Sequence, residues 1–207
     1  MKITRFTQSC LFVEEAKARI LIDPSGVESD NLEKFGALDA VLYTHEHSDH
    51  FDPVLTKKFL RRKVRVYANE STARLIKGRI EQVVEDRGVI TLKWVEIRVI
   101  ELPHCPMPDG SSGPQNTGYL INGTLFHPGD GKELSGLQVD NLAVPITGPD
   151  VSMRDAFDFL KQVGAKTGIP IHYDKLGANA EVYKTFAGYF DFPFELKPLA
   201  NGESLEI

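Results

Sequence analysis

The feature that most restricts the fold of this chain is a dense group of metal-binding side chains directly after a short apolar segment. Ala40-Val41-Leu42-Tyr43 is apolar and partly β-branched, which predicts a buried strand. The segment Thr44-His45-Glu46-His47-Ser48-Asp49-His50 follows it. His45 and His47 are two residues apart, so they point to the same side of an extended chain. The pattern therefore predicts a metal-binding loop at the edge of a sheet.

Three more side chains that can bind metals each follow a predicted strand. His104 comes after the apolar run 95–102, Asp130 after the run 123–127, and His172 after the run 167–171. Layered α/β folds place their ligands at such strand ends. Imidazole and carboxylate ligands together suit Zn²⁺, Fe²⁺ or Mn²⁺, and the chain has no obvious thiolate set for a closed structural zinc site.

The apolar pattern predicts many short strands and a few helices. Strands are expected at 2–6, 10–14, 18–22, 40–43, 64–68, 81–84, 88–92, 94–101, 117–121, 123–127, 141–146, 167–171 and 194–198. Helices are expected at 53–61, 71–78, 152–163 and 179–189. Asp52 and Pro53 provide a start for the first helix, and Ser152 with Asp155 resembles a capping box.

The expected strands form hairpins early in the chain and alternate with helices in its last third. This order predicts an α+β fold or a layered α/β sandwich. Asn122-Gly123 is a strong hairpin signal within this pattern. No polar linker divides the 207 residues, so we expect a single domain over 1–207.

Charge and composition restrict the functional class. The chain has 24 Lys and Arg residues and 29 Asp and Glu residues, so its net charge is −5. This acidity disfavours nucleic acid as the main partner. Two cysteines do not make a disulfide scaffold in a chain of this length and indicate a reducing, cytoplasmic location. The start MKITRFTQSC does not read as a signal peptide, and no stretch approaches the ~20 apolar residues of a membrane span.

These motifs together resemble the metallo-β-lactamase superfamily, and within it the compact branch of L-ascorbate-6-phosphate-lactonase-like metal-dependent hydrolases. The resemblance extends from about residue 3 to residue 205. It is carried by 44–50, His104, 127–130 and 171–174, with support from 9–13, 20–24 and 116–120. It implies an αββα sandwich of two mixed β-sheets flanked by helices.

The resemblance also implies a dinuclear site. In the family pattern His45, His47 and His104 hold one metal, Asp49, His50 and His172 hold the other, and Asp130 bridges the two. The expected cofactors are two divalent metal ions, with zinc favoured over manganese or iron. A metal-bridging hydroxide would attack a small ester, lactone or phosphoester. Asp49 would orient that water or accept its proton.

Three other functions compete with this hypothesis. A metal-dependent nuclease or phosphodiesterase would use the same chemistry, but the basic residues at 57–58 and 61–63 form a short run that is typical of a solvated helix face. An iron-based oxidoreductase could use the same ligands and ranks third. A metal-stabilised binding module without activity ranks last. We expect a small-molecule substrate and no membrane partner, and a homo-oligomer is compatible with the sequence.

Several neighbours of the ligands have predicted supporting roles. His127 is expected to orient or pack around the site, and Asp23 is expected either to hydrogen-bond a metal-binding histidine or to form a plain turn. Asn116 either reaches the site or satisfies the loop at 103–118. Tyr173 is the candidate catalytic donor to a substrate oxyanion, with a packed tyrosine at the pocket edge as the alternative.

The remaining polar candidates carry weaker expectations. Lys132 and Lys175 could contact an anionic group but are more typical of surface charges, whereas Cys10 and Cys105 are expected to be buried fillers. Two positions depart from the family pattern. Residue 8 is glutamine where histidine is common, and residue 131 is glycine where threonine or serine is usual. Neither departure removes a metal ligand, but both leave the substrate open.

Overall fold

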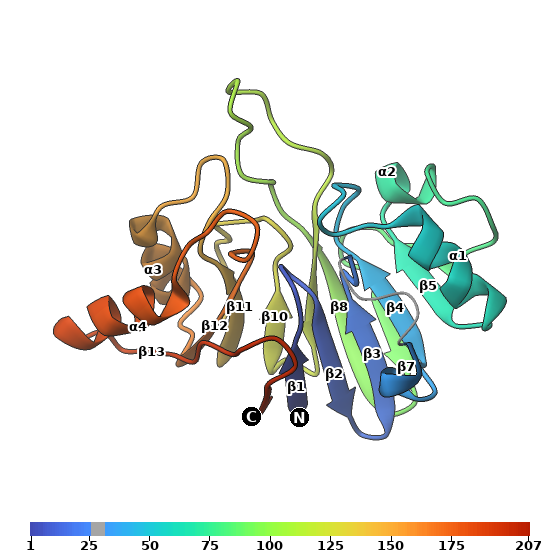
Figure 1. Cartoon of the computed structure of the whole chain (residues 1–207), viewed down its shortest axis with the longest axis horizontal. Coiled ribbons are helices and arrows are strands. Elements are labelled where there is room, and N and C mark those ends of the chain that lie inside the picture. Colours follow the sequence, from blue (N-terminus) through green and yellow to red (C-terminus); the bar gives the residue numbers. More distant parts are fainter. Residues whose placement is uncertain (26–31) are drawn as a thin grey trace.

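The computed structural model describes residues 1–25 and 32–207, which form four layers (Figure 1). Two seven-stranded sheets pack face to face in the middle. Helices α1 (Pro53–Arg61) and α2 (Glu70–Ala73) lie outside one sheet, and α3 (Met153–Gln162) and α4 (Ala180–Tyr189) lie outside the other. The predicted αββα sandwich is therefore confirmed.

The first sheet has the strand order β14-β1-β2-β3-β4-β5-β6. Its strands are β1 (Lys2–Arg5), β2 (Leu11–Glu15), β3 (Ala18–Ile22), β4 (Ala40–Tyr43), β5 (Arg65–Ala68), β6 (Gln82–Val83) and β14 (Ser204–Glu206). The pairs from β14 to β3 are antiparallel, and the pairs from β3 to β6 are parallel. Parallel strands share a direction, so β3, β4 and β5 end at one edge of the sheet.

The second sheet has the strand order β13-β12-β11-β10-β9-β8-β7. Its strands are β7 (Val89–Leu92), β8 (Val95–Glu101), β9 (Thr117–Ile121), β10 (Leu125–His127), β11 (Asn141–Pro145), β12 (Thr167–Ile171) and β13 (Glu195–Leu196). β9 is antiparallel to both β8 and β10, and β10, β11 and β12 are parallel. β8, β10 and β12 therefore end at the same edge of the sheet.

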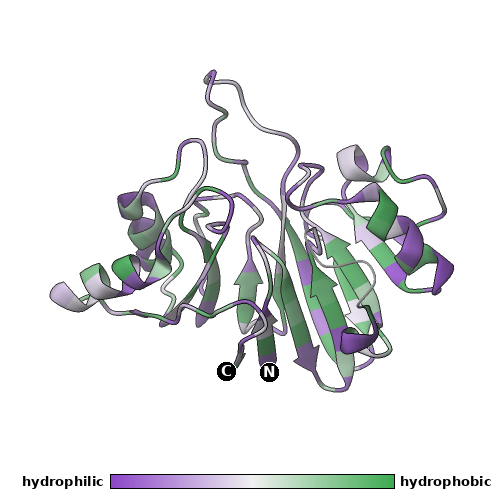
Figure 2. Ribbon diagram, viewed as in Figure 1, coloured by the Kyte–Doolittle hydropathy of each residue, from purple (hydrophilic) through white to green (hydrophobic). Residues whose placement is uncertain are grey.

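Strand β4 shows how the layers are built. Ala40 and Leu42 belong to the apolar cluster between the two sheets, whereas Val41 and Tyr43 belong to the cluster that includes Leu55 of α1. Successive side chains of a strand point to opposite faces, so a continuous apolar run serves both layers. Figure 2 shows the result, with hydrophobic strands in the middle and hydrophilic residues on the outer side of α1.

Local signals explain most of the helix and turn positions. The Asp52 side chain accepts hydrogen bonds from the backbone N–H groups of Val54 and Leu55 at the start of α1. The capping box of Ser152 and Asp155 is present at the start of α3. Asn122 and Gly123 both have positive φ, 47° and 64°, as the predicted hairpin turn requires.

The helix expected at 71–78 is much shorter in the structure. α2 ends at Ala73, and the N–H groups of Leu75 and Ile76 bond to carbonyls three residues back rather than four. The tighter turns end the α-helix before the apolar residues that suggested it. Two short elements were not expected, namely β14 and a 3₁₀ turn at Leu32–Phe35.

Within the described ranges, the helices are all too short or too polar to cross a membrane. β1 pairs with β14, so both termini enter the same sheet. The interpretation of residues 1–207 as one domain stays a prediction.

Candidate metal centre

The loops that carry the predicted ligands meet at one edge of the sandwich. They follow β4, β8, β10 and β12, whose shared direction in each sheet places their ends together. One group of donor atoms within 4.8 Å of one another comes from His45, His47, His104 and Asp130, and a second from Asp49, His50 and His172. The structure thus brings together all seven residues proposed as ligands.

The Asp130 carboxylate lies between the two groups. Its Oδ1 is 3.0 Å from His50 Nε2, and its Oδ2 is 3.3 Å from both His104 Nε2 and His172 Nε2. The residue is only 4% exposed. One carboxylate that contacts histidines of both groups has the position required to bridge two cations.

Three buried atoms of this cluster have no hydrogen-bond partner in the described chain. They are His50 Nε2, His104 Nε2 and Asp130 Oδ1. Buried polar atoms are nearly always satisfied, and leaving one unsatisfied costs about 1–3 kcal/mol. Divalent cations would satisfy all three atoms, and mixed imidazole and carboxylate donors suit zinc, manganese or iron. The residues present therefore fit bound metal.

The imidazole rings are oriented from behind by hydrogen bonds to Nδ1. His50 Nδ1 donates to Asp23 Oδ2 at 2.8 Å, His104 Nδ1 to the Cys105 carbonyl at 2.6 Å, and His172 Nδ1 to the Thr147 carbonyl at 2.8 Å. Each bond leaves Nε2 free to face the cluster. Such partners select the ring tautomer that a metal requires.

Asp23 supports the ligand loop at two points. It is fully buried at the end of β3, and its Oδ1 and Oδ2 also accept hydrogen bonds from the Thr44 backbone N–H and hydroxyl, at 2.8 and 2.6 Å. Its carboxylate therefore joins the start of the ligand loop to the ring of His50. Of the two expectations for Asp23, the structure supports the hydrogen bond to a proposed ligand, His50.

The turn that carries Asp130 is held by two side chains. His127 Nε2 donates to the Ser9 carbonyl at 2.8 Å, and its Nδ1 accepts from the Gly129 N–H at 3.2 Å. Asn116 donates to the Pro128 carbonyl at 2.9 Å and accepts from the Asp130 N–H at 3.2 Å. His127 and Asn116 thus position the Asp130 carboxylate.

We expect Gly129→Ala to destabilise the protein by about 2–4 kcal/mol and to weaken metal binding. Gly129 has a φ of 60°, and a Cβ there would lie 2.2 Å from Asn116 Oδ1 and 2.8 Å from Thr44 Cβ. The matched control is Gly123→Ala, because Gly123 has a φ of 64° with nothing within 4 Å. In denaturant unfolding, the control should lose only about 1–2 kcal/mol of unfolding free energy. Equal losses would contradict the packing argument.

Burial and mutual proximity shift the titration of the cluster when no cation is bound. Burial and the neighbouring His50 hold the pKa of His45 well below 6.5. Burial also lowers the pKa of His50, but Asp130 and Asp23 outweigh it and raise that pKa well above 6.5. Burial would raise the pKa of Asp130, but His50 and His104 bring it well below 3.8.

Metal binding is therefore expected to release protons. Burial lowers the pKa of three rings, but their neighbours outweigh it: Asp130 and Asp23 raise the pKa of His50, Asp130 and Cys105 raise that of His104 to about 10, and Asp49 and Asp130 raise that of His172. Protons therefore compete with a cation for these rings. Affinity should rise with pH by at least about tenfold per unit near neutrality, because fewer protons compete. Calorimetry in two buffers of different ionisation enthalpy counts the released protons, and identical enthalpies in both would be inconsistent with this expectation.

The structure does not bring Tyr173 into the cluster as an oxyanion donor. Its hydroxyl donates to the Leu199 carbonyl at 3.0 Å, and the Arg5 guanidinium lies 4.0 Å from its ring centre. The proton is thus already engaged, and the packed alternative describes this residue better. Lys132 is paired with Asp150 at 2.8 Å, as a surface charge would be.

The smaller candidates have structural surroundings that explain them. Cys10 and Cys105 are free thiols and are buried, as expected. A Cβ at Gly131 would lie 2.4 Å from Leu102 Cδ1, so the Leu102 side chain occupies the space that a serine or threonine would need. The Lys175 backbone N–H donates to Gln8 Oε1, whereas its side chain is exposed.

Gln8 has a role that sequence reasoning missed. Its Nε2 donates to Asp49 Oδ2 at 3.1 Å, and its carbonyl accepts the His172 N–H at 3.1 Å. Gln8 and His172 both have positive φ, 59° and 62°. Such backbone conformations persist where the surroundings enforce them, often at functional sites. The only sequence signal was that Gln8 replaced the usual histidine.

The fold and site define an αββα sandwich with a candidate metal centre at one edge of its two sheets. Residues 2–172 match the family model for the beta-lactamase superfamily domain. The chain belongs to the metallo-β-lactamase superfamily, as its motifs suggested.

Individual relatives extend this likeness over most of the chain. Protein Rv0786c of Mycobacterium tuberculosis is 31% identical over 179 residues, covering 83% of this chain and 84% of that protein. A UPF0173 metal-dependent hydrolase of Pyrococcus furiosus is 28% identical over a 230-residue alignment that covers 100% of both. The solved structure of Igni18, a metallo hydrolase from Ignicoccus hospitalis, has a TM-score of 0.79 at 20% identity and covers 100% of this chain and 98% of that one.

Proposed function

We propose that this protein is a metal-dependent hydrolase that uses two divalent cations to cleave a small ester, lactone or phosphoester. The observation that carries the proposal is the pair of adjoining donor groups, with Asp130 between them and three buried donor atoms unsatisfied. The metal-dependent hydrolase of Pyrococcus furiosus, similar to this chain over its whole length, supports the reaction class.

Each residue of the centre has a proposed role. His45, His47 and His104 would hold one cation, Asp49, His50 and His172 the other, and Asp130 would bridge them. When bound, such cations lower the pKa of water and so supply a hydroxide nucleophile near neutral pH. Asp49, held at Oδ2 by the Gln8 amide and 3.2 Å from His172 Nε2, would orient the attacking water or accept its proton.

The donor set favours zinc, with manganese or iron as alternatives, because it contains nitrogen and oxygen atoms and no thiolate. A net charge of −5 supports a small-molecule substrate over nucleic acid. The two buried free thiols support a cytoplasmic location.

A substrate panel with defined metals tests the proposed function. Lactones, phosphodiesters, phosphomonoesters and thioesters are offered to the protein loaded with Zn²⁺ or Mn²⁺, and to His45→Ala as the inactivated comparison. We expect turnover of at least one ester class that disappears in the variant and after chelation. Turnover that survives both treatments would refute the site, and iron with redox-linked absorbance would refute the hydrolase.

A further inference from the structure

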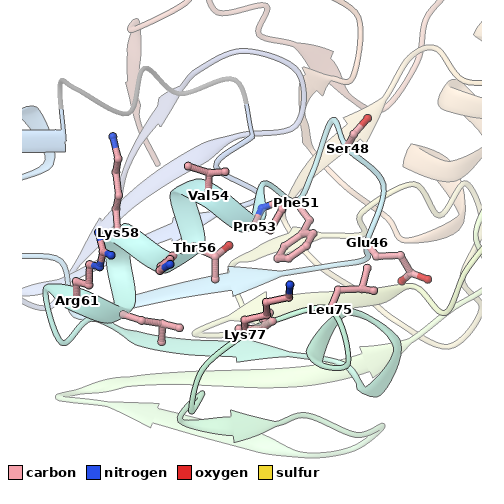
Figure 3. A pocket seen from close by; sticks show the side chains of 13 residues that line it. Glu46, Ser48, Phe51, Pro53, Val54, Thr56, Lys58, Arg61, Leu75 and Lys77 are labelled. Atoms are coloured by element: carbon pink, nitrogen blue, oxygen red, sulfur yellow. The ribbon is translucent and has the colours of Figure 1, made fainter.

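A second recess lies beside the ligand loop, on the side of α1. It is a cavity of about 710 Å³ between α1 and the segment that follows α2 (Figure 3). Glu46 and Ser48 line one end of it, and they alternate along the chain with the ligands His45 and His47. The volume falls in the range of roughly 300–1,000 Å³ that is typical of small-molecule pockets.

The interior of this recess is apolar. Phe51, Val54, Leu75 and Ile76 line it, and Figure 3 shows Val54 on α1 and Leu75 on the segment after α2. Val54 is 66% exposed and Leu75 is 50% exposed, so two large apolar side chains face solvent here. An apolar ligand that covered them would remove this surface from water, which is favourable.

The recess also has a cationic rim. Lys57 and Arg61 lie one helical turn apart on α1, and Lys77 comes from the segment after α2. Among the residues that the structure describes, none forms an ion pair with these three side chains. Glu46 is the one carboxylate among the described lining residues, and its Oε2 accepts a hydrogen bond from Ser71 at 2.6 Å. The protein as a whole is acidic, so this local positive charge is distinctive.

We propose that this recess binds a single-chain amphipathic anion. Its carboxylate or phosphate head would lie against Lys57, Arg61 and Lys77, and its hydrocarbon chain would cover Val54 and Leu75. Charge complementarity selects an anion, and the apolar interior selects a hydrocarbon tail. Single-stranded nucleic acid fits less well, because Phe51 is only 4% exposed and cannot serve as a stacking platform. The proposal is independent of the proposed hydrolase activity.

Calorimetry with octyl phosphate and octanoate tests the ligand class. Both should bind at least about tenfold more tightly than octyl glucoside, which has the tail without the charge, and than ethyl phosphate, which has the charge without the tail. Each CH₂ added within the cavity should tighten binding by about fourfold. Equal binding of the neutral glucoside, or no dependence on chain length, would overturn the proposal.

Substitutions locate the site. Lys57→Gln with Arg61→Gln should weaken octyl phosphate binding by roughly tenfold. Arg62→Gln with Lys63→Gln removes the same charge outside the cavity and should leave binding unchanged. Leu75→Gln should also weaken binding, whereas Leu176→Gln, at a similarly exposed leucine elsewhere, should not.

Two alternative occupants have distinct outcomes. In one outcome, octyl phosphate binds only to zinc-loaded protein and with the same affinity in the Lys57→Gln, Arg61→Gln double variant. That result would place the ligand at the metal centre and overturn the proposal. In another outcome, octyl phosphate does not bind, whereas anionic vesicles or single-stranded oligonucleotides bind in a way that depends on Lys57 and Arg61. That outcome would overturn the proposal and identify the partner as a membrane or a nucleic acid. The proposal is supported if octyl phosphate binds to metal-free, chelator-treated protein and if this binding is lost in the double variant.

Discussion

Asp130→Asn is expected to lower kcat/KM by at least about a thousandfold and to remove at least one bound cation. The Asp130 carboxylate lies 3.0–3.3 Å from Nε2 of His50, His104 and His172, so it contacts histidines of both donor groups. An amide has no negative charge and offers one oxygen instead of two. It could not neutralise and bridge two cations in this position.

The measurement combines steady-state kinetics with elemental analysis of the purified variant. The matched control is Asp150→Asn, an exposed carboxylate paired with Lys132 at 2.8 Å, which should keep full metal content and activity. Circular dichroism shows whether each variant is folded. If folded Asp130→Asn retained both cations and turnover, the assignment of Asp130 as a bridging ligand would be wrong.

The second large effect is expected for Asp23→Asn, at a residue outside the two groups of proposed ligands. Oδ2 accepts hydrogen bonds from both the Thr44 hydroxyl and the His50 ring, while Oδ1 accepts the Thr44 N–H. An amide that keeps the Thr44 N–H bond presents its NH₂ group to His50 Nδ1–H, and two donors cannot pair. We expect metal affinity to fall by about 10- to 100-fold and unfolding free energy by about 1–3 kcal/mol.

Asp39→Asn is the control for the stability part of this effect. Asp39 precedes β4 at the end opposite the ligand loop, and its Oδ2 likewise accepts a backbone N–H, from Arg19 at 2.9 Å. It should lose some stability without any change in metal affinity. Competition with a chromophoric chelator measures the affinity of both variants. A parallel loss of affinity in both would show that Asp23 acts only through global stability.

The strand and turn positions followed largely from local chemistry. β4 could be predicted at 40–43 because four successive apolar side chains need cover on both faces of a strand. The starts of α1 and α3 followed from Asp52 and from Ser152 with Asp155. The helix at α2 was predicted, but its end was not, because the run 74–77 has the composition of a helix yet folds into tighter turns beside the cavity.

Asp23 and His127 were expected to support the site, but two other supporting contacts could not be predicted from local patterns. The bond from Gln8 to Asp49 and the bond from the His172 ring to the Thr147 carbonyl join segments far apart in sequence. Gln8 stands where the family pattern has histidine and Thr147 lies outside the motifs, so neither residue type indicated these contacts. The same limit affected Tyr173, whose residue type suggested a donor but whose hydroxyl is bonded to Leu199.

The sequence by itself determined which side chains can bind metal and that they follow strand ends, because these properties depend on residue type and on the short-range pattern. Only the tertiary structure decided which of them face one another. Asp130 lies between the two histidine groups because β8, β10 and β12 end at one edge of their sheet and pack against the loop after β4. That arrangement depends on strand order and direction, which arise from pairing between distant segments.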